Sequence, residues 1–574
     1  MCGILGGNNR NWDYKKGIES IRHRGPDACR TEEFQDCTLA FARLAIIDLS
    51  ENGMQPMTSM DGNVTIVYNG EIYGYTSLKR ELEKKYRFRS SGDTEVILNA
   101  YMEYGDGFID KIDGMFAIAI YDRRTMELKL YRDRAGIKPL YYYCNNGRFA
   151  FASEIKALEK ACGDVAWRMD YTALYDYLFY QYIPEPKTMY MDCYKLLPAH
   201  VLVYDLKNRN IKGIHKYWKL HVNTAKGRRR KEEVLCEELR SLLSDSVRQQ
   251  LIADVPVGCF LSGGVDSSII SYECNKYSPD IHTYTIGFKE KLYDESGYAD
   301  IMTAKYGLNC SKKILEYKDI EGIKGRLRDW YDEPFADTSA YPSYLVSELA
   351  RRDVTVVLTG DGGDELFGGY HRYRSYVESL KGKRIDSEIL GKLSRRTGLD
   401  GILPEVILRR YVHTGLDHYI PYIHMSDKGD VESYRKKWGI GKDYDVWWHL
   451  RKYYRRELPP ITRARYLDFK TYLPGDILTK VDRVSMANSL EARVPFLGRR
   501  LMEFAFSLSE EECCSADMLK RILKKSYEDV IPKELLYREK KGFAVPANYF
   551  RAQRRNTPIT CEILKREWND EKFI

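Results

Sequence analysis

Hydrophobic and polar positions alternate in short runs over residues 1–205. Turn-forming Gly, Asn and Asp residues separate these runs, which are Thr38–Ile47, Val64–Tyr68, Met115–Tyr121, Leu128–Tyr131 and Arg148–Ala152. Such a pattern predicts packed antiparallel strands. Thr76–Lys85 and Thr94–Tyr104 have helical spacing and lie between strands. We therefore expect residues 1–205 to form an α+β layered domain with strands on two sheets.

The pattern changes after a polar and basic stretch, which predicts a linker over residues 206–230. Lys231–Leu251 has the spacing of an amphipathic helix. A strand at Val255–Leu261, a Gly-rich turn and a helix from Ser267 follow it. Further strands at His282–Phe288 and Val354–Thr359 alternate with helical segments. This alternation predicts an α/β doubly wound parallel sheet within residues 231–574, with extra helices toward the end of the chain.

Length, composition and charge restrict the class of protein. At 574 residues the chain is too long for one hydrophobic core. Its 44% hydrophobic and 30% charged residues are ordinary for a globular protein. The formal net charge of +8 is mild for this length, so charge does not support a nucleic-acid partner.

Cysteine usage and hydropathy indicate the compartment. The 13 cysteines are isolated apart from Cys513 and Cys514, without a C-x-x-C pair or zinc-like Cys/His spacing. No charged-then-apolar leader opens the sequence, and no apolar run reaches the ~18 residues of a membrane span. We expect a cytoplasmic protein with reduced thiols and no membrane partner.

A cysteine at position 2 is the first candidate for chemistry. If Met1 is removed, Cys2 carries both a thiol and a free α-amine, so that a nucleophile and its base share one residue. An α-amine titrates near pH ~8, so part of it is unprotonated at neutral pH. Whether Met1 is removed is not given by the sequence, although cysteine is small enough to permit it.

Two Gly-rich loops follow predicted strands. Ser262–Ser268 joins a strand to a helix, and its hydroxyls, glycines and helix-start N–H groups favour a phosphate or pyrophosphate. Asp266 is placed to hold Mg²⁺ against those phosphates. Thr359–Tyr370 supplies further carboxylates and glycines at the end of another strand. Since ligands of parallel sheets bind at the carboxyl ends of strands, both loops are expected to face one crevice.

Short motifs follow one another in a fixed order along nearly the whole chain. The N-terminal motifs are Cys2-Gly-Ile, Arg22–Asp27, Arg43–Asp48, Tyr68–Tyr73, Ser91–Val96, Asp113–Ala117, Tyr131–Leu140 and Phe151–Lys156. They resemble a class II glutamine amidotransferase domain with an N-terminal-nucleophile layered sandwich. The later motifs are Ser262–Ser268, Gly360–Tyr370 and Glu491–Leu497, and they resemble an ATP-pyrophosphatase type synthetase domain. In this order the chain resembles the glutamine-hydrolysing asparagine synthetases.

The resemblance implies roles at a glutamine site. Cys2 would attack the glutamine amide, giving a γ-glutamyl thioester and ammonia. Asn69 and the Gly70 N–H would form the oxyanion hole. Arg43 would pair with the glutamine α-carboxylate. The α-ammonium would be held by Asp93, with the Ile47 backbone and Glu71.

The resemblance also implies a second site that uses ATP and Mg²⁺. The acceptor carboxylate, most simply that of aspartate, would attack the α-phosphorus and release pyrophosphate. Ammonia would then displace AMP from the acyl-adenylate after passing through an apolar tunnel. The implied residues are Leu261, Ser262, Gly264, Asp266, Ser267, Ile286, Thr359 and Gly360 for ATP, Asp266 and Asp364 for Mg²⁺, and Lys480 and Arg483 for phosphate charge.

Alternatives concern the acceptor and the activity. Asp361, a candidate catalytic acid, stands where many asparagine-forming relatives carry Glu, so another acceptor carboxylate on a sugar, peptide or cell-envelope precursor stays open. A non-catalytic interaction protein would be expected to lose at least one of these side chains. An amide synthetase without glutaminase activity would not need Cys2. The sequence does not decide between Lys480 and Arg483, and it leaves a homodimer open.

Overall fold

The computed structural model describes residues 2–224, 230–380, 415–423 and 428–539, together with 545, 546, 549, 560, 561, 563, 564 and 568. From the sequence we also expect Lys541 and Gly542 to contact phosphate, but both lie outside the described residues. Within these ranges no helix is long and apolar enough to cross a membrane.

The N-terminal domain is built on two six-stranded antiparallel sheets. One has the order β10-β8-β9-β1-β3-β2 and the other β12-β11-β7-β6-β5-β4. The strands are β1 (Gly3–Gly7), β2 (Ala28–Glu33), β3 (Thr38–Arg43), β4 (Met57–Thr58), β5 (Val64–Tyr73), β6 (Asp113–Asp122), β7 (Glu127–Arg132), β8 (Tyr141–Asn145), β9 (Arg148–Ala152), β10 (Cys193–Lys195), β11 (His200–Asp205) and β12 (Asn210–Lys216).

Helices cover the outer faces of both sheets, so the domain has four layers. Between the sheets lies a core that includes Ile4, Phe41 and Val67. α1 (Tyr14–Glu19) and α4 (Ile155–Ala161) cover the first sheet, while α2 (Thr76–Leu82) and α3 (Asp93–Tyr104) cover the second. Because both faces are covered, every residue of β3 is buried. The predicted α+β layered sandwich is confirmed.

The C-terminal domain contains a five-stranded parallel sheet in the order β15-β14-β13-β16-β17. Its strands are β13 (Val257–Phe260), β14 (His282–Phe288), β15 (Asn309–Leu315), β16 (Val356–Leu358) and β17 (Glu491–Arg493). The predicted doubly wound parallel sheet is confirmed. β15 and β17 were not predicted, since alternating polar residues in β15 and the brevity of β17 hide them.

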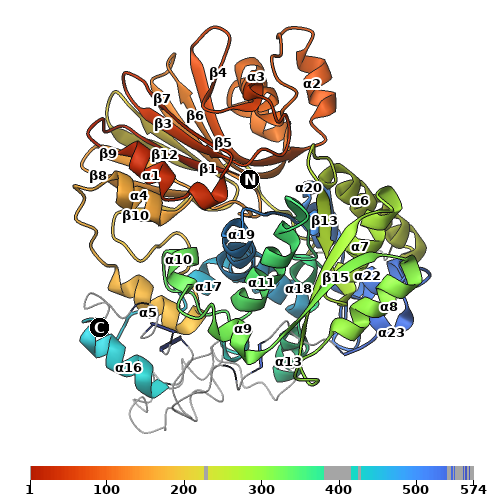
Figure 1. The fold of residues 1–574 in the computed structure, drawn as a ribbon. Coiled ribbons are helices and arrows are strands. Elements are labelled where there is room, and N and C mark those ends of the chain that lie inside the picture. Colours follow the sequence, from red (N-terminus) through yellow and green to blue (C-terminus); the bar gives the residue numbers. More distant parts are fainter. Residues whose placement is uncertain are drawn as a thin grey trace.

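Helices surround this sheet in the lower part of Figure 1. They are α6 (Glu232–Gln250), α7 (Val265–Tyr277), α8 (Ser296–Tyr306), α9 (Tyr317–Glu321), α10 (Leu327–Tyr331), α11 (Ala340–Arg351), α12 (Gly363–Phe367), α13 (His371–Ser379), α16 (Lys428–Lys437), α17 (Trp448–Tyr453), α18 (Pro460–Lys470), α19 (Leu478–Met486), α20 (Arg499–Ser507), α21 (Glu510–Cys513), α22 (Arg521–Ser526) and α23 (Lys533–Leu536).

Two segments differ from the predicted domain boundaries. β12 lies inside residues 206–230, which were predicted as a linker, and pairs with β11 at the edge of a sheet. Its mostly exposed residues explain why the pattern looked like a linker. α5 (Tyr171–Tyr180), within residues 1–205, packs into the core of the C-terminal domain, where the Tyr177 hydroxyl donates to the Thr560 carbonyl at 3.0 Å.

A buried cluster of charged side chains joins the two domains. Its members are Arg24, Lys138, Glu154 and Lys156 from the N-terminal domain and Asp332, Asp482 and Arg483 from the C-terminal domain. Arg24 is fully buried and forms two hydrogen bonds to Asp482, at 2.8 and 3.0 Å, and one to Glu154 at 2.9 Å. The paired hydrogen bonds between Arg24 and Asp482 offset the desolvation cost of burying these charges.

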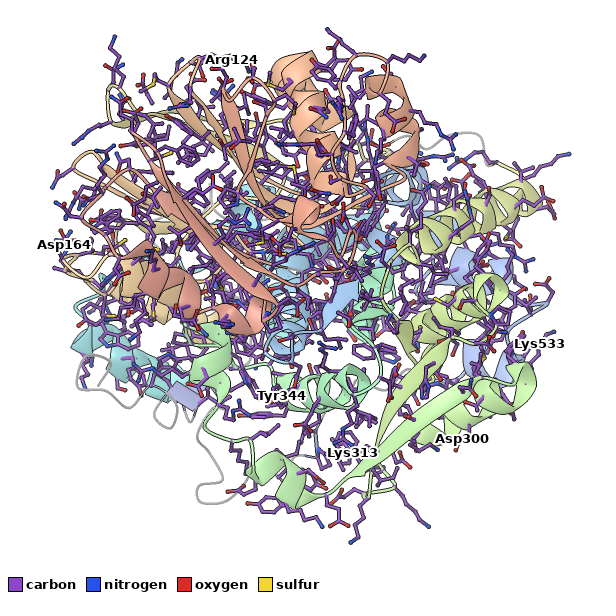
Figure 2. The ribbon with its side chains drawn as sticks, turned by 45° about the horizontal axis from the view of Figure 1, so that its top comes forward. Arg124, Asp164, Asp300, Lys313, Tyr344 and Lys533 are labelled. Atoms are coloured by element: carbon purple, nitrogen blue, oxygen red, sulfur yellow. The ribbon has the colours of Figure 1, made fainter. Side chains whose placement is uncertain are left out.

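The cluster lies at the centre of the molecule. In Figure 1, α19 and the N-terminus meet where the two domains join. In Figure 2, Arg124 and Asp164 mark outer parts of the N-terminal domain, and Asp300 and Lys533 mark outer parts of the C-terminal domain. Arg493 adds a second link, because its guanidinium lies 3.3 Å from Glu71 and donates to the Gln250 carbonyl at 2.7 Å.

We expect Arg24→Met to lower the thermal unfolding temperature by roughly 5 °C or more, because removing one partner of a buried pair costs about 3–5 kcal/mol. Differential scanning calorimetry would measure the shift. Arg22→Met is the matched control, since Arg22 forms an exposed pair with Glu19 and such pairs contribute little. Equal unfolding temperatures for the two variants would contradict a structural role for the cluster.

Candidate functional site

Cys2 precedes β1 and lies at the meeting point of both domains. Its backbone nitrogen donates to Asn69 Oδ1 at 3.0 Å, and its carbonyl accepts from Arg24 Nε at 3.3 Å. The Cys2 thiol faces the Leu44 carbonyl, with the Sγ at 3.8 Å. Burial raises the pKa of this thiol, so the resting group is neutral and needs a base before it can act as a nucleophile.

Asn69 presents a donor beside the thiol. The side chain is fully buried in the middle of β5, and its Oδ1 is already engaged by the Cys2 nitrogen. Among the described residues its Nδ2 has no hydrogen-bond partner. A buried, unpaired N–H group costs free energy unless a ligand satisfies it. An incoming oxyanion is a suitable ligand, because the donor is already fixed in place.

Gly70 follows Asn69 at a position where no side chain fits. A Cβ there would lie 2.1 Å from the Met115 carbonyl oxygen on the neighbouring strand β6. The glycine therefore lets β5 and β6 pair closely beside Cys2, which keeps the Asn69–Gly70 peptide in place.

Arg43 ends β3 and is held by the loop that follows it. Its guanidinium donates to the Ser50 carbonyl at 2.8 Å and also to the Asp48 carbonyl. A Cβ on Gly53 would lie 2.6 Å from Arg43 Nη2, so the glycine leaves room for the guanidinium. Ile47 lies in the same loop and packs near the domain interface. The loop thus orients a buried cation near the thiol.

Asp93 and Glu71 form a buried acidic pair. Asp93 begins α3 and accepts hydrogen bonds from the Tyr68 hydroxyl at 2.9 Å and the Ile72 N–H at 3.1 Å. Burial raises the pKa of Asp93 to about 6, although these bonds lower it. Burial and the neighbouring Asp93 raise the pKa of Glu71 well above its usual value. At neutral pH the pair therefore carries its negative charge mainly on Asp93.

A large cavity of about 880 Å³ lies in the C-terminal domain. It is formed at the carboxyl ends of β13, β14 and β16, where parallel sheets bind ligands. The residues predicted to bind ATP all line it, namely Leu261, Ser262, Gly264, Asp266, Ser267, Ile286, Thr359 and Gly360. Asp361, Asp364 and Lys480 line it as well. The two Gly-rich loops therefore face one cavity, as the sequence predicted.

Glycines allow the two loops to approach closely. A Cβ on Gly360 would lie 2.9 Å from the Cβ of Asp266, and one on Gly363 would lie 2.5 Å from Asp266 Oδ1. Both distances are too short for real side chains. The glycine-rich character of the second loop is thus explained by its contact with the first loop at Asp266.

Lys520 is a charged residue of this cavity that the sequence did not predict. Its ammonium contacts Asp266 and lies 2.6 Å from Asp364 Oδ1. Burial opposes its charge, yet the two carboxylates raise the pKa of Lys520 above its usual value. No sequence signal points to this lysine, because it is 254 residues from Asp266 along the chain.

The pair Asp266 and Asp364 fits a magnesium site. Both carboxylates converge on the same cation, the Lys520 ammonium, and so can share another. Mg²⁺ is commonly bound by one or two carboxylates together with substrate phosphates. Across the described ranges no group of three or more His, Cys, Asp or Glu side chains is arranged to hold a metal ion.

The structure separates Lys480 from Arg483. Lys480 lines the cavity and is held by Asp337 at 2.7 Å and by the Ser339 hydroxyl at 2.8 Å. Arg483 is buried in the domain interface and lies 3.1 Å from Glu154 and 3.0 Å from the Tyr141 hydroxyl. Of these two residues, Lys480 lies with the two Gly-rich loops at the cavity, whereas Arg483 contacts residues of the domain interface.

Asp361 and Glu365, from the second Gly-rich loop, form an acidic wall of the cavity. Asp361 accepts a hydrogen bond from the Thr359 hydroxyl at 2.7 Å. Burial raises the pKa of Asp361, while Thr359 and Lys480 lower it. Burial and Asp364 raise the pKa of Glu365 to about 7. This wall can hold a positively charged group or accept a proton near neutral pH.

Comparison with known proteins relates the chain to enzymes of one kind. A family model described as asparagine synthase matches residues 238–564, and one described as glutamine amidotransferase domain matches residues 1–218. Asparagine synthetase [glutamine-hydrolyzing] 1 of Bacillus subtilis is 33% identical, covering 96% of this chain and 88% of that protein.

Two further relatives carry different names, one a synthetase and one an amidase. A putative asparagine synthetase [glutamine-hydrolyzing] 2 of Methanocaldococcus jannaschii is 34% identical, covering 86% of this chain and 100% of that protein. Amidase chry2 of Gibberella zeae is 29% identical, covering 88% of this chain and 82% of that protein.

We expect the Asp93 carboxyl to titrate near pH 6, which ¹³C NMR of carboxyl-labelled aspartate would measure, with Asp93→Asn to assign the signal. Tyr68→Phe should raise this pKa, because the lost hydroxyl donates to the charged form. Tyr75→Phe is the control, since its hydroxyl donates to the Ser91 carbonyl instead. A pKa that stays near 4 in the unmodified protein would show that burial does not govern this carboxyl.

Proposed function

Because this chain belongs to the family of glutamine-hydrolysing asparagine synthetases, we propose that it converts aspartate to asparagine with ammonia taken from glutamine. ATP activates the acceptor carboxylate as an acyl-adenylate, and pyrophosphate and AMP are released. The observation that carries this proposal is the convergence of the Ser262–Ser268 loop, the Thr359–Asp364 segment and Lys480 on one cavity.

Glutamine hydrolysis takes place at Cys2. After removal of Met1, the free α-amine of Cys2 accepts the thiol proton. A base is necessary because burial raises the pKa of the thiol. The thiolate attacks the side-chain amide of glutamine. Asn69 Nδ2 has no hydrogen-bond partner in the part of the chain that the structure describes, which supports its role as an oxyanion donor together with the Gly70 N–H.

Glutamine is held as a zwitterion in this proposal. Arg43 pairs with the α-carboxylate, since its guanidinium is fixed and buried near the thiol. Asp93 binds the α-ammonium, with help from the Ile47 backbone and Glu71. The ionised state of Asp93 above pH 6 supports this assignment, because an ammonium needs a negative partner.

Adenylation takes place in the cavity of the C-terminal domain. The hydroxyls and N–H groups of Ser262–Ser268 bind the phosphates, and Asp266 and Asp364 would hold Mg²⁺ beside them. The metal would neutralise phosphate charge during attack by the acceptor. Lys480, already oriented by Asp337 and Ser339, stabilises the charge that develops on the α-phosphate.

Ammonia passes between the sites along apolar surface. A small hydrophobic cluster formed by Leu44, Ile46, Val356 and Met486 lies between the domains. The Leu44 carbonyl lies 3.8 Å from the Cys2 Sγ. Val356 lies on β16, and Thr359 follows the end of this strand. Apolar walls disfavour protonation of ammonia to ammonium, so that the nucleophile reaches the acyl-adenylate intact.

Aspartate is the acceptor that best fits the cavity wall. It carries an ammonium and two carboxylates, and the wall offers the carboxylates of Asp361 and Glu365 beside the Lys480 cation. The names of the Bacillus and Methanocaldococcus relatives support this choice. The alternative is the same chemistry on a different acceptor carboxylate, such as one on a sugar or cell-envelope precursor; the Gibberella relative is named an amidase and not an asparagine synthetase.

We expect Cys2→Ala to abolish glutamine-dependent synthesis, by at least ~10³-fold, while leaving ammonia-dependent synthesis largely intact, because ammonia can reach the adenylate directly. The measurement is product formation with glutamine or with ammonium chloride as donor. Cys29→Ala, at an exposed thiol, should leave both rates unchanged. Loss of both rates in Cys2→Ala would contradict the two-site assignment.

We expect pyrophosphate release from ATP and Mg²⁺ to require aspartate and to yield asparagine. A coupled pyrophosphate assay with and without aspartate, followed by amino-acid analysis, measures both. Asp361→Glu should retain aspartate as acceptor with a changed rate, since a longer side chain moves the acid by ~1.5 Å relative to a group held near ~3 Å. Glutamine hydrolysis without aspartate-dependent pyrophosphate would instead identify another acceptor.

A further inference from the structure

Lys520 has a positive φ, and its side chain fills a space that a neighbouring glycine leaves open. Its φ is +54°, in the left-handed region, where residues other than glycine are held only at a cost of about 1 kcal/mol or more. The residue immediately precedes α22, and the side chain is buried. A Cβ on Gly369 would lie 2.1 Å from Lys520 Cε, so Gly369 leaves the space that the lysine fills.

The ammonium of Lys520 occupies the point where two carboxylates converge. It contacts Asp266 from the first Gly-rich loop and Asp364 from the second. These are the two carboxylates that the proposed function assigns to Mg²⁺. An ammonium and a divalent cation cannot share one position, because both require the same oxygens and repel each other.

We propose that Lys520 is a resident cation of the nucleotide-free site, which Mg²⁺ displaces only together with ATP, and that its ammonium then binds the β- and γ-phosphates. This inference rests on the proposed function, since it concerns the same cavity. It assigns Lys520 a role in nucleotide binding that follows from its position between Asp266 and Asp364.

Charge balance supports an exchange of cations. Without ligand, two carboxylates held at one point in a partly dehydrated cavity repel each other, and one ammonium reduces this cost. When Mg²⁺ enters with the triphosphate, the metal takes over the carboxylates and the phosphates offer new oxygens to the ammonium. The four-carbon side chain of lysine is flexible enough to move between these partners.

The exchange has a consequence for metal binding. Mg²⁺ alone must expel a well-paired ammonium and leave it without an anion inside the cavity, which is unfavourable. The nucleotide removes this penalty, since its phosphates pair with the displaced lysine. Metal and nucleotide therefore bind cooperatively, and free metal does not fill the site in advance.

The test is Mn²⁺ binding to the full chain, followed by electron paramagnetic resonance, with and without ATP and in the absence of acceptor. We expect Lys520→Met to bind Mn²⁺ without nucleotide at least ~10-fold more tightly than the unmodified protein, because the competing charge is gone. The same variant should bind Mn²⁺–ATP at least ~10-fold less tightly, because a phosphate ligand is lost.

Two further variants fix the site of the effect. Lys525→Met, on the same helix but paired with Glu528 at 2.8 Å, should leave both affinities unchanged. Adding Asp266→Asn to Lys520→Met should abolish the gain in nucleotide-free Mn²⁺ affinity, because one of the two metal ligands is neutral. Thermal unfolding of each variant shows whether it is folded, and Lys520→Gln serves in place of any Lys520→Met protein that is not.

The outcomes separate this inference from the proposed function. If the unmodified protein binds Mn²⁺–ATP but Lys520→Met has the same nucleotide-free Mn²⁺ affinity as the unmodified protein, the exchange is wrong and the function stands. If the unmodified protein binds no Mn²⁺–ATP at all, the proposed function itself is wrong. A gain in Lys520→Met that persists with Asp266→Asn would place the metal elsewhere and also overturn the exchange.

Discussion

The buried pairing of Arg24 with Asp482 is the interaction on which the arrangement of both sites depends. The Arg24 guanidinium binds the carbonyl of Cys2 and both carboxylate oxygens of Asp482. Asp482 lies on α19, two residues from Lys480, so the two side chains point to opposite sides of the helix. One side of α19 thus fixes the position of Cys2, while the other orients a lysine in the cavity of the C-terminal domain.

Several buried carboxylates at the candidate sites have a cation beside them. Glu71 faces Arg493, Asp337 binds Lys480, and Asp266 shares Lys520 with Asp364. Burial alone would neutralise such acids, and a nearby cation opposes this by favouring the charged form. The proposed reaction depends on this balance, since its amide donor, triphosphate and acceptor carboxylate are charged or become charged during reaction.

In the proposed reaction, phosphate binding and acceptor choice use the second Gly-rich loop in different ways. Phosphate binding would use backbone N–H groups, glycines and hydroxyls of two loops, which tolerate little change because the loops touch at Asp266. Asp361 and Glu365 lie on the second of these loops and contribute their side chains to the cavity. Replacing such side chains changes the chemistry of the cavity while the loop backbone is kept, so that one fold can serve several acceptors.

The sequence by itself determined the two fold classes, the order of the domains and the loops that line the cavity of the C-terminal domain. These features are local: strand periodicity, glycine spacing and a cysteine at position 2 are read within a few residues. Only the tertiary structure decided that Lys480 faces the cavity while Arg483 joins the domains, that β12 continues a sheet, that α5 packs with the C-terminal domain, and that Lys520 meets Asp266. Each of these depends on contacts between distant segments, whose positions are set by packing and burial and leave no periodic signal along the chain.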